Sequence, residues 1–321
     1  MVDTPSLFVK TVADQLRSAL NEIIFGQSAN VDLLIVGLLS EGHILLEGIP
    51  GTAKTTMVKT LAQLTQLAYR RIQLTPDMLP AEIIGTSVYD LNSRTFSFKP
   101  GPVFTDLLLA DEINRTPPKT QSALLEAMEE HQVTVDGERH ELSPLFTVLA
   151  TLNPIEFEGT YPLPEAQLDR FMMKLLVGYP DGQAEKQMLN RFVDRERSTR
   201  FQAETFAPVT DQATILQCRQ ALNHIRVDDS MMDYILGMIQ DTRKNPNLEL
   251  GCSPRSALSL MTASRAHAAI QGAEFITPDN VKAVAAAVIR HRLILTAEAE
   301  LDGLTPDAVI QQTMDKIPVP R

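Results

Sequence analysis

The segment from His43 to Thr55, His-Ile-Leu-Leu-Glu-Gly-Ile-Pro-Gly-Thr-Ala-Lys-Thr, constrains the fold of this chain more than any other stretch. Three consecutive apolar residues, 44–46, predict a short buried strand of a parallel sheet. Gly48 ends that strand, and apolar residues then recur at helical spacing from Thr55 to about residue 67. A strand, a tight loop ending in lysine and threonine, and a helix are typical of a phosphate-binding loop. The sequence therefore predicts an α/β fold with a phosphate site at this turn.

The residue types of the loop suit phosphate binding. Small residues allow backbone N–H groups to surround phosphate oxygens, and the helix N-terminus adds partial positive charge. The lysine is placed to reach the β- and γ-phosphates of a nucleotide, and the threonine after it to hold Mg²⁺. One departure is that alanine stands where the usual pattern has glycine before the lysine, so an ordinary strand-to-helix turn is the alternative. The predicted nucleotide-binding residues are Gly48, Ile49, Pro50, Gly51, Thr52, Ala53, Lys54, Thr55 and Thr56, with Thr55 also a metal ligand.

A second apolar run, Leu107–Ala110, ends in the acids Asp111 and Glu112. Ligands of parallel sheets bind at the carboxyl ends of the strands, so we expect these acids near the phosphate loop. Asp111 is predicted to bind Mg²⁺, and Glu112 to polarise the water that attacks the γ-phosphate. Taken alone, two acids after an apolar run also suit the solvent-exposed start of a helix.

Two further strands are predicted in the first half of the chain. Residues 145–151 form an apolar run that leads to Asn153, whose side chain is placed either to order the attacking water or to form an Asx turn before proline. After a short helix that carries Asp169 and Arg170, residues 172–179 form the other strand. Strands and helices thus alternate over residues 40–180, which predicts a parallel α/β sheet.

The strand pattern stops at residue 181, and helical periodicity follows. Helices are predicted at 182–197, 210–225, 228–244, 254–271 and 278–295. We expect two domains: an α/β nucleotide-binding domain at 1–180 and a smaller, all-helical domain at 181–321. Two hairpins are predicted within the first, one in the irregular segment 75–102 and one around Asp136-Gly137. The first of these is either an interaction loop or only a surface hairpin.

Composition narrows the class of protein. A net charge of −11 argues against a general electrostatic hold on nucleic acid. Cys218 and Cys252 have no metal-ligand spacing around them and are expected to be reduced thiols of a cytosolic protein. Residues 1–10 lack the pattern of a signal peptide, and no apolar stretch is long enough for a membrane span. The sequence therefore predicts a cytoplasmic protein.

Six separated motifs occur in a characteristic order: Gly-Ile-Pro-Gly-Thr-Ala-Lys-Thr, Ile-Gln-Leu-Thr-Pro-Asp-Met-Leu-Pro, Asp-Glu-Ile-Asn-Arg, Thr-Leu-Asn-Pro, Leu-Asp-Arg-Phe and Cys-Ser-Pro-Arg-Ser. With them the chain resembles the AAA+ ATPases and, among these, the MoxR family, over about residues 10–295. Alanine at position 53 is usual in that family. The resemblance implies a P-loop AAA+ core followed by a helical lid domain, and ATP and Mg²⁺ as ligands.

The resemblance also implies roles for single residues. Asn153 matches sensor 1, and Arg170 matches the arginine finger that reaches a neighbouring subunit, with Arg115 the alternative for that role. Arg255 matches sensor 2, which closes the helical lid over the nucleotide. Gly26 and Gln27 match the box on the adenine side; the neighbouring residues 24 and 25 either form an adenine pocket wall or pack in the core.

Two alternatives to these roles follow from the residues themselves. Arg170 could simply pair with Asp169, and Arg255 could cap a helix or form a salt bridge within the helical domain.

Members of the family usually form hexameric rings and act as chaperone-like machines on other protein complexes. Many work with proteins that carry a von Willebrand factor A domain. We therefore expect a homo-hexameric ATPase that remodels, assembles or activates partner complexes. A helicase or loader that acts on nucleic acid and an ATP-gated scaffold with little turnover are the alternatives.

Overall fold

A five-stranded parallel sheet lies at the centre of the α/β part of the chain, in the order β2-β5-β8-β1-β9. The computed structural model describes residues 4–92, 94–154, 159–197 and 206–320. The strands of this sheet are β1 (Ile44–Glu47), β2 (Tyr69–Gln73), β5 (Leu107–Asp111), β8 (Thr147–Leu152) and β9 (Met173–Leu176). The predicted α/β parallel sheet is confirmed, and the strand before the phosphate loop lies between β8 and β9.

Both faces of the three inner strands of the sheet, β5, β8 and β1, are buried. In β5, Leu107 and Leu109 join one hydrophobic cluster, whereas Leu108 and Ala110 join another. Successive side chains of a strand point to opposite faces, so a strand covered on both sides must be apolar throughout. This explains why these strands read as continuous apolar runs in the sequence.

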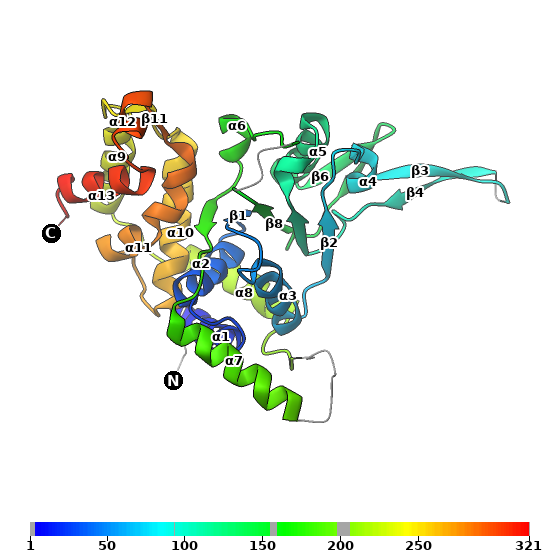
Figure 1. The fold of residues 1–321 in the computed structure, drawn as a ribbon, viewed down its shortest axis with the longest axis horizontal. Coiled ribbons are helices and arrows are strands. Elements are labelled where there is room, and N and C mark those ends of the chain that lie inside the picture. Colours follow the sequence, from blue (N-terminus) through cyan, green and yellow to red (C-terminus); the bar gives the residue numbers. More distant parts are fainter. Residues whose placement is uncertain (1–3, 93, 155–158, 198–205, 321) are drawn as a thin grey trace.

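Helices flank the sheet (Figure 1). The cluster that contains Leu107 is completed by α1 (Pro5–Asn21), α2 (Ser28–Leu39) and α3 (Lys54–Thr65). The cluster that contains Leu108 is completed mainly by α5 (Pro118–Glu130). Shorter helices in the same half of the chain are α4 (Pro80–Ile84), the 3₁₀ turn η1 (Ile113–Arg115) and α6 (Glu165–Leu168).

Two antiparallel hairpins confirm those predicted from the sequence. They are β3 (Gly85–Asp90) with β4 (Thr95–Pro100), and β6 (Gln132–Val135) with β7 (Glu138–Glu141). Asp136 and Gly137 both have positive φ, as a two-residue type I′ turn requires. The β3–β4 hairpin extends far from the body of the molecule (Figure 1). On this hairpin the exposed rings of Tyr89 and Phe96 lie 5.1 Å apart between centroids.

The second half of the chain is helical, as predicted. Its helices are α7 (Gly182–Arg197), α8 (Gln212–Ala221), α9 (Asp229–Thr242), α10 (Pro254–Ile270), α11 (Pro278–Ile289), α12 (Ala297–Leu301) and α13 (Pro306–Lys316), with 3₁₀ turns η2 (Leu222–His224) and η3 (Arg290–Arg292). One predicted boundary is wrong, because the last predicted helix ends at Ile289 rather than 295. The chain turns there into η3, after which β11 (Ile294–Leu295) pairs with β10 (Leu248–Leu250).

The N-terminal helices pack on the helical half of the chain. α1 and α2 both contact α10, and α1 also contacts α8. Leu16 of α1 and Leu260 of α10 are fully buried in the same hydrophobic cluster. A single core thus runs across residue 180, and the division of the chain there stays a prediction.

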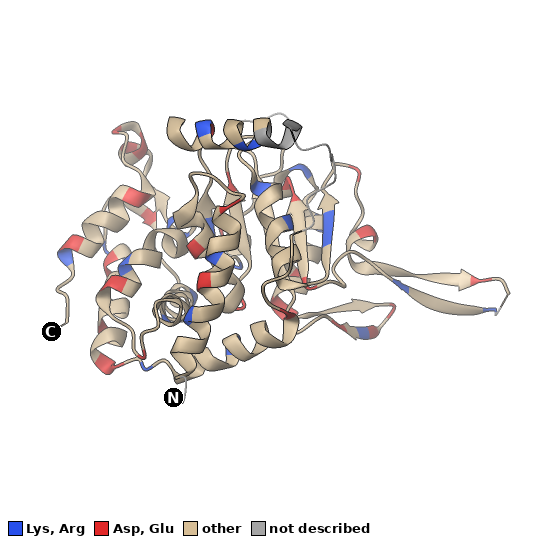
Figure 2. Cartoon of the chain, turned by 90° about the horizontal axis from the view of Figure 1, so that it is seen from below, with Lys and Arg blue, Asp and Glu red and all other residues tan. Residues whose placement is uncertain are grey.

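Charged residues of both signs occur throughout the fold. Figure 2 shows Lys and Arg scattered among Asp and Glu along helices and strands alike. Among the helices of the described residues, none is both long and apolar enough to cross a membrane.

Candidate active site

The loop after β1 is held in a conformation that its small residues permit. A Cβ on Gly48 would lie 2.2 Å from the carbonyl oxygen of Val177, so glycine is what allows β1 and the end of β9 to approach. Gly51 has φ +85° and Ala53 has φ +64°. Ala53 therefore adopts the left-handed conformation for which glycine is the usual residue, at a cost of about 1 kcal/mol. Alanine at position 53 therefore changes the side chain of the common loop pattern but keeps its backbone conformation.

Lys54 is the first residue of α3, and its ammonium group points back into the loop. It donates hydrogen bonds to the carbonyl oxygens of Gly48 and of Ile49, the latter at 2.8 Å. Partial burial lowers the pKa of Lys54, while the nearby Asp111 and Glu112 oppose that shift. The lysine is therefore partly desolvated and hydrogen-bonded to loop carbonyls. An anion such as a phosphate would compete effectively with these carbonyls for its ammonium group.

A cavity of about 480 Å³ opens beside this loop. Its lining includes residues 50–56, both acids at the end of β5, and Asn153 after β8. The structure thus brings together most of the residues predicted from the sequence to bind nucleotide or attack it. The lining also includes Arg71, Gln73 and Met188, which the sequence did not indicate.

A threonine orients the acidic pair. The hydroxyl of Thr151 donates to Oδ1 of Asp111 at 3.2 Å and accepts the backbone N–H of Glu112 at 2.9 Å. Glu112 has φ +59°, a sparsely populated conformation for a residue with a side chain. Its carboxylate pairs with Nε of Arg115 at 3.1 Å, while Oδ2 of Asp111 pairs with Nε of Arg71 at 2.6 Å. Both acids are therefore fixed by contacts from neighbouring strands and turns.

The donor groups in the cavity fit a magnesium ion carried by a nucleotide. The Thr55 hydroxyl and the Asp111 carboxylate both line the cavity and are hard oxygen ligands. Mg²⁺ in phosphate-transfer sites takes one or two protein oxygens, with phosphate oxygens and waters completing the shell. The roles of Thr55 and Asp111 as ligands stay predictions that this donor set supports.

Gly26 and Gln27 lie apart from the cavity lining. The Gln27 amide donates to the carbonyl oxygen of Gly178 at 2.9 Å, and a Cβ on Gly26 would lie 2.9 Å from the Cβ of Pro180. These two residues tie the start of α2 to the segment after β9, and their role on the adenine side stays a prediction. The neighbouring Ile24 is 2% exposed and belongs to the hydrophobic core, which favours core packing for its side chain.

Arg170 and Arg255 also lie outside the cavity lining, and they share one acid. Arg170 pairs with Oε2 of Glu129, and Arg255 pairs with Oε1 of the same residue, both at 3.0 Å. The two structural alternatives considered for these arginines are therefore wrong: Arg170 does not take Asp169 as its partner, and the partner of Arg255 lies on α5 rather than in the helical half. To close over the nucleotide of its own chain, Arg255 would have to leave Glu129.

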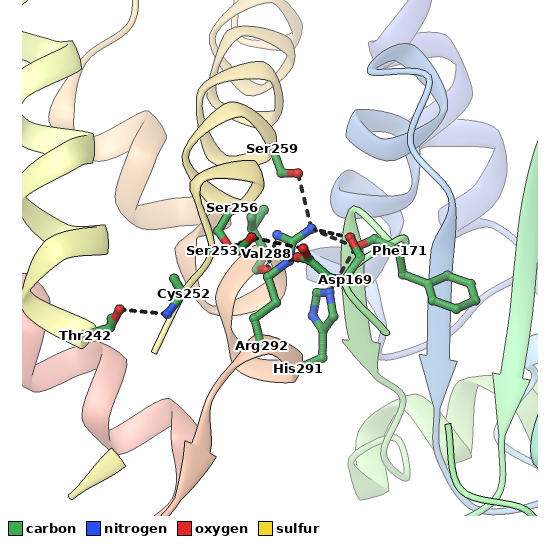
Figure 3. A network of polar contacts seen from close by, with 10 residues as sticks. All are labelled: Asp169, Phe171, Thr242, Cys252, Ser253, Ser256, Ser259, Val288, His291 and Arg292. Carbon is green, nitrogen blue, oxygen red and sulfur yellow. Dashed lines mark hydrogen bonds and ion pairs between the residues drawn. The ribbon is translucent and has the colours of Figure 1, made fainter. Parts of the chain in front are cut away.

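Asp169 is occupied by a buried network that links it to the helical half (Figure 3). Its Oδ1 lies 2.7 Å from Nε of Arg292, and its Oδ2 accepts the hydroxyl of Ser253 at 2.9 Å. Arg292 also donates to the carbonyl oxygens of Val288 and Phe171. Its side chain is only 3% exposed, and burial lowers its pKa while Asp169 opposes that shift. This network joins the segments that carry Arg170 and Arg255.

Sequence reasoning missed Arg71, Glu129 and Arg292. Arg71 could have been found from the strand pattern, because it lies on the same face of β2 as Gln73, which pairs in register with Asp111. Glu129 and Arg292 carry no local signal, since one reads as a surface residue of a helix and the other as a basic residue near a helix end.

Comparisons with known proteins agree with this geometry. A family model described as "ATPase family associated with various cellular activities (AAA)" matches residues 43–173, and one described as "AAA lid domain" matches residues 240–313. A strand-loop-helix phosphate site, an acidic pair on a second strand of the same sheet and a helical lid define an AAA+ ATPase.

Comparison with individual relatives shows to which family of AAA+ ATPases the chain belongs. It is 42% identical over 301 residues to the uncharacterized protein YeaC of Bacillus subtilis, covering 94% of this chain and 92% of that one. It is 40% identical over 308 residues to chaperone MoxR1 of Mycobacterium tuberculosis, covering 93% and 80%. A crystal structure described as a candidate ATPase from Cytophaga hutchinsonii superposes with a TM-score of 0.90 at 36% identity, covering 99% and 97%. The chain belongs to the MoxR family of AAA+ ATPases.

Proposed function

We propose that this ATPase binds ATP with Mg²⁺ beside the phosphate loop, hydrolyses it within a ring of identical subunits, and uses the cycle to remodel partner protein complexes. The observation that carries the proposal is the grouping of Lys54, Thr55, Asp111, Glu112 and Asn153 around one cavity. No single one of these residues is specific. Together they provide a phosphate cation, two metal ligands, a base and a polar group for the attacking water.

Within this cavity each residue has a distinct task. Lys54 exchanges its loop carbonyl partners for the β- and γ-phosphates, and the loop N–H groups bind the remaining oxygens. Thr55 and Asp111 hold Mg²⁺, which neutralises phosphate charge when bound. Glu112 accepts a proton from the attacking water, and Asn153 orients that water. The backbone of Glu112 is strained in a way often seen at functional sites, which supports this assignment.

Arg170 is proposed to act on the nucleotide of a neighbouring subunit. Arg255, as sensor 2, would have to leave Glu129 to close over the nucleotide of its own chain, so we propose in place of that role that it acts beside Arg170. Phosphoryl transfer spreads negative charge over the γ-phosphate, and an arginine at that point is worth about 10³–10⁵-fold in rate. Both arginines lie outside the cavity lining of their own chain and share Glu129. An arrangement in which they reach a second copy makes hydrolysis depend on subunit geometry. A homo-hexameric ring, as in the family, satisfies this requirement.

The remodelling function rests on the relatives and on one exposed element. One relative is named as a chaperone. The β3–β4 hairpin carries Leu91 and Phe96, which are 82% and 73% exposed, and such side chains suit contact with protein partners. We propose that the cytoplasmic complexes on which this ATPase acts include a protein with a von Willebrand factor A domain.

A multiple-turnover phosphate-release assay with Mg²⁺-ATP tests the proposal, with Lys54→Ala as the matched variant. We expect steady turnover by the wild type, and loss of most ATP affinity in Lys54→Ala, measured by calorimetry, with an unchanged circular dichroism spectrum. Binding without turnover would instead support the ATP-gated scaffold. Strong stimulation of the wild type by DNA would support a helicase or loader.

A further inference from the structure

Arg71 is the one charged residue of the cavity that the proposed mechanism leaves without a task among those described. It lies on β2, next to β5 in the sheet, and its side chain shares a face with Gln73. Gln73 is the register partner of Asp111, which places Arg71 two residues before the acid on the adjacent strand. From there its guanidinium reaches Oδ2 of Asp111, with 2.6 Å between Nε and the oxygen.

Both oxygens of the Asp111 carboxylate are occupied. Oδ1 accepts the hydroxyl of Thr151, and Oδ2 accepts Arg71. Asp111 itself is 5% exposed, so a second cation can approach only from the cavity. In the proposed mechanism Mg²⁺ binds the same carboxylate. A guanidinium stays protonated at all relevant pH values, and two cations at one oxygen repel each other.

Asp111 and Arg71 differ in how strongly their surroundings restrict them. Asp111 is enclosed, whereas the side chain of Arg71 is 51% exposed. The other contact described for this guanidinium is with the Gln73 amide oxygen, at the long distance of 3.4 Å. A half-exposed arginine can move from its partner into water at little cost, since its charge remains hydrated. Arg71 is therefore the mobile member of the pair.

We propose that Arg71 is an exchangeable counter-ion of Asp111. It neutralises the carboxylate while the cavity lacks nucleotide, and it yields Oδ2 to the Mg²⁺ that arrives with the nucleotide. This inference rests on the proposed function, since it needs Mg²⁺ at Asp111. Arg71 is thus a positioning residue that acts through Asp111, and it sets how much Mg²⁺ the site requires.

The test measures binding rather than activity. A fluorescent, non-hydrolysable ATP analogue is held at a fixed concentration near its dissociation constant, and free Mg²⁺ is titrated from chelator to saturation. Because Arg71 competes with the metal, Arg71→Ala should lower the half-saturating Mg²⁺ concentration by about 2- to 5-fold, the range expected for a partly exposed ion pair. Arg71→Gln, which keeps a polar side chain of similar reach, should shift it in the same direction.

Arg70→Ala is the matched control. Arg70 is the preceding residue of the same strand, points to the other face, and donates to the carbonyl oxygen of Gly101 at 3.3 Å. It should leave the Mg²⁺ midpoint at the wild-type value. Asp111→Asn should remove most of the Mg²⁺ dependence, and adding Arg71→Ala to it should change nothing further, because the two residues act as one unit.

An unchanged or raised Mg²⁺ midpoint in both Arg71 variants would overturn the exchange and leave Arg71 as a fixed structural partner of Asp111. Failure of the proposed function looks different. In that case the wild-type protein itself would not bind the analogue at any Mg²⁺ concentration.

Discussion

The nucleotide cavity and the arginine face hold their charged groups in different ways. We define the arginine face by Glu129, Arg170 and Arg255, with the pair Asp169–Arg292 behind it. In the cavity, Lys54 contacts backbone carbonyls of its own loop, and the Asp111 carboxylate is shared between the buried Thr151 hydroxyl and the half-exposed Arg71. On the arginine face, Arg170 and Arg255 share the carboxylate of Glu129 and lie beside the pair Asp169–Arg292, whose arginine is buried and which joins two halves of the chain.

This difference matches what each region must do in a cycle of hydrolysis. The cavity has to exchange partners whenever nucleotide enters or leaves, so weak and mobile contacts are suitable there. In the proposed ring, the arginine face presents two cations at a defined position to a second copy, where misplacement by about 1 Å costs about 10²-fold in rate. A buried, multiply bonded support provides such a position.

The largest expected effect comes from separating the two regions between subunits. Arg170→Ala subunits should keep ATP affinity, because the cavity is intact, but should lose about 10³–10⁵-fold in turnover. Lys54→Ala subunits have the opposite defect, a damaged cavity with an intact arginine face. Mixing the two variants should restore activity, measured by phosphate release, because some intact arginines then meet intact cavities.

The control for this experiment is subunit exchange, followed by energy transfer between labelled chains. Exchange without recovery at several mixing ratios would show that Arg170 acts inside its own subunit. The two regions would then not be halves of one site shared between copies.

A smaller effect is expected when only the base in the cavity is changed. Glu112→Gln keeps the size of the side chain but cannot accept a proton, so turnover should fall by about 10²-fold or more. ATP binding should persist, because Asp111 and Lys54 are unchanged. Calorimetry and phosphate release on the same preparation check both halves of this expectation, and a wild-type rate would rule out Glu112 as the base.

The two regions also differ in how far the sequence predicts them. The cavity is built from one continuous strand-loop-helix and from the ends of neighbouring apolar strands, so short-range patterns identify most of its residues. The same patterns predicted the parallel sheet, both hairpins and most helices.

Predictions failed where contacts distant in sequence decide the outcome. Ser253 stands at the N-cap position of α10, yet its hydroxyl donates to Asp169 and makes no cap hydrogen bond. The end of α11 was missed because pairing of β11 with β10 ends the helical pattern early. The support of the arginine face joins residues more than 100 positions apart, and no local periodicity encodes such a pairing. Arg71 was overlooked because a single arginine on a strand is common.

The stability of the two regions should respond differently to loss of an arginine. Arg292→Met leaves Asp169 without its buried cation, which typically costs about 3–5 kcal/mol. Arg71→Ala removes a half-exposed partner and should cost about 1 kcal/mol or less. Thermal unfolding midpoints of both variants, compared with the wild type, check this ranking. Equal unfolding midpoints for Arg292→Met and Arg71→Ala would show that the Asp169–Arg292 ion pair does not stabilise the fold more than the Arg71–Asp111 pair does.

The smallest expected effect is a loss of stability in mild acid, and it should be centred on the arginine face. His43 lines a cavity there with Glu129 and Arg170, and its ring accepts the N–H of Val148 and contacts the carbonyl oxygen of Met128. Burial, with smaller contributions from nearby cationic groups, lowers the pKa of His43 from 6.5 to about 4. The unfolded chain therefore binds a proton between these two values that the folded chain does not.

Stability from His43 is thus fully present above pH 6.5 and is lost as the pH falls toward 4, with about 1 kcal/mol lost by pH 5.5. His291, whose pKa burial also lowers, adds a loss of the same sign. His43→Gln, which can both donate and accept, should therefore flatten the dependence of the unfolding midpoint on pH without abolishing it. Hydrogen exchange sharpens the comparison: between pH 7.5 and 5.5, after correction for intrinsic rates, protection should fall more in residues 169–173 than in residues 44–47. Met172 donates its backbone N–H to the carbonyl oxygen of His43, so the segment of Arg170 is hydrogen-bonded to the backbone of the residue that is protonated.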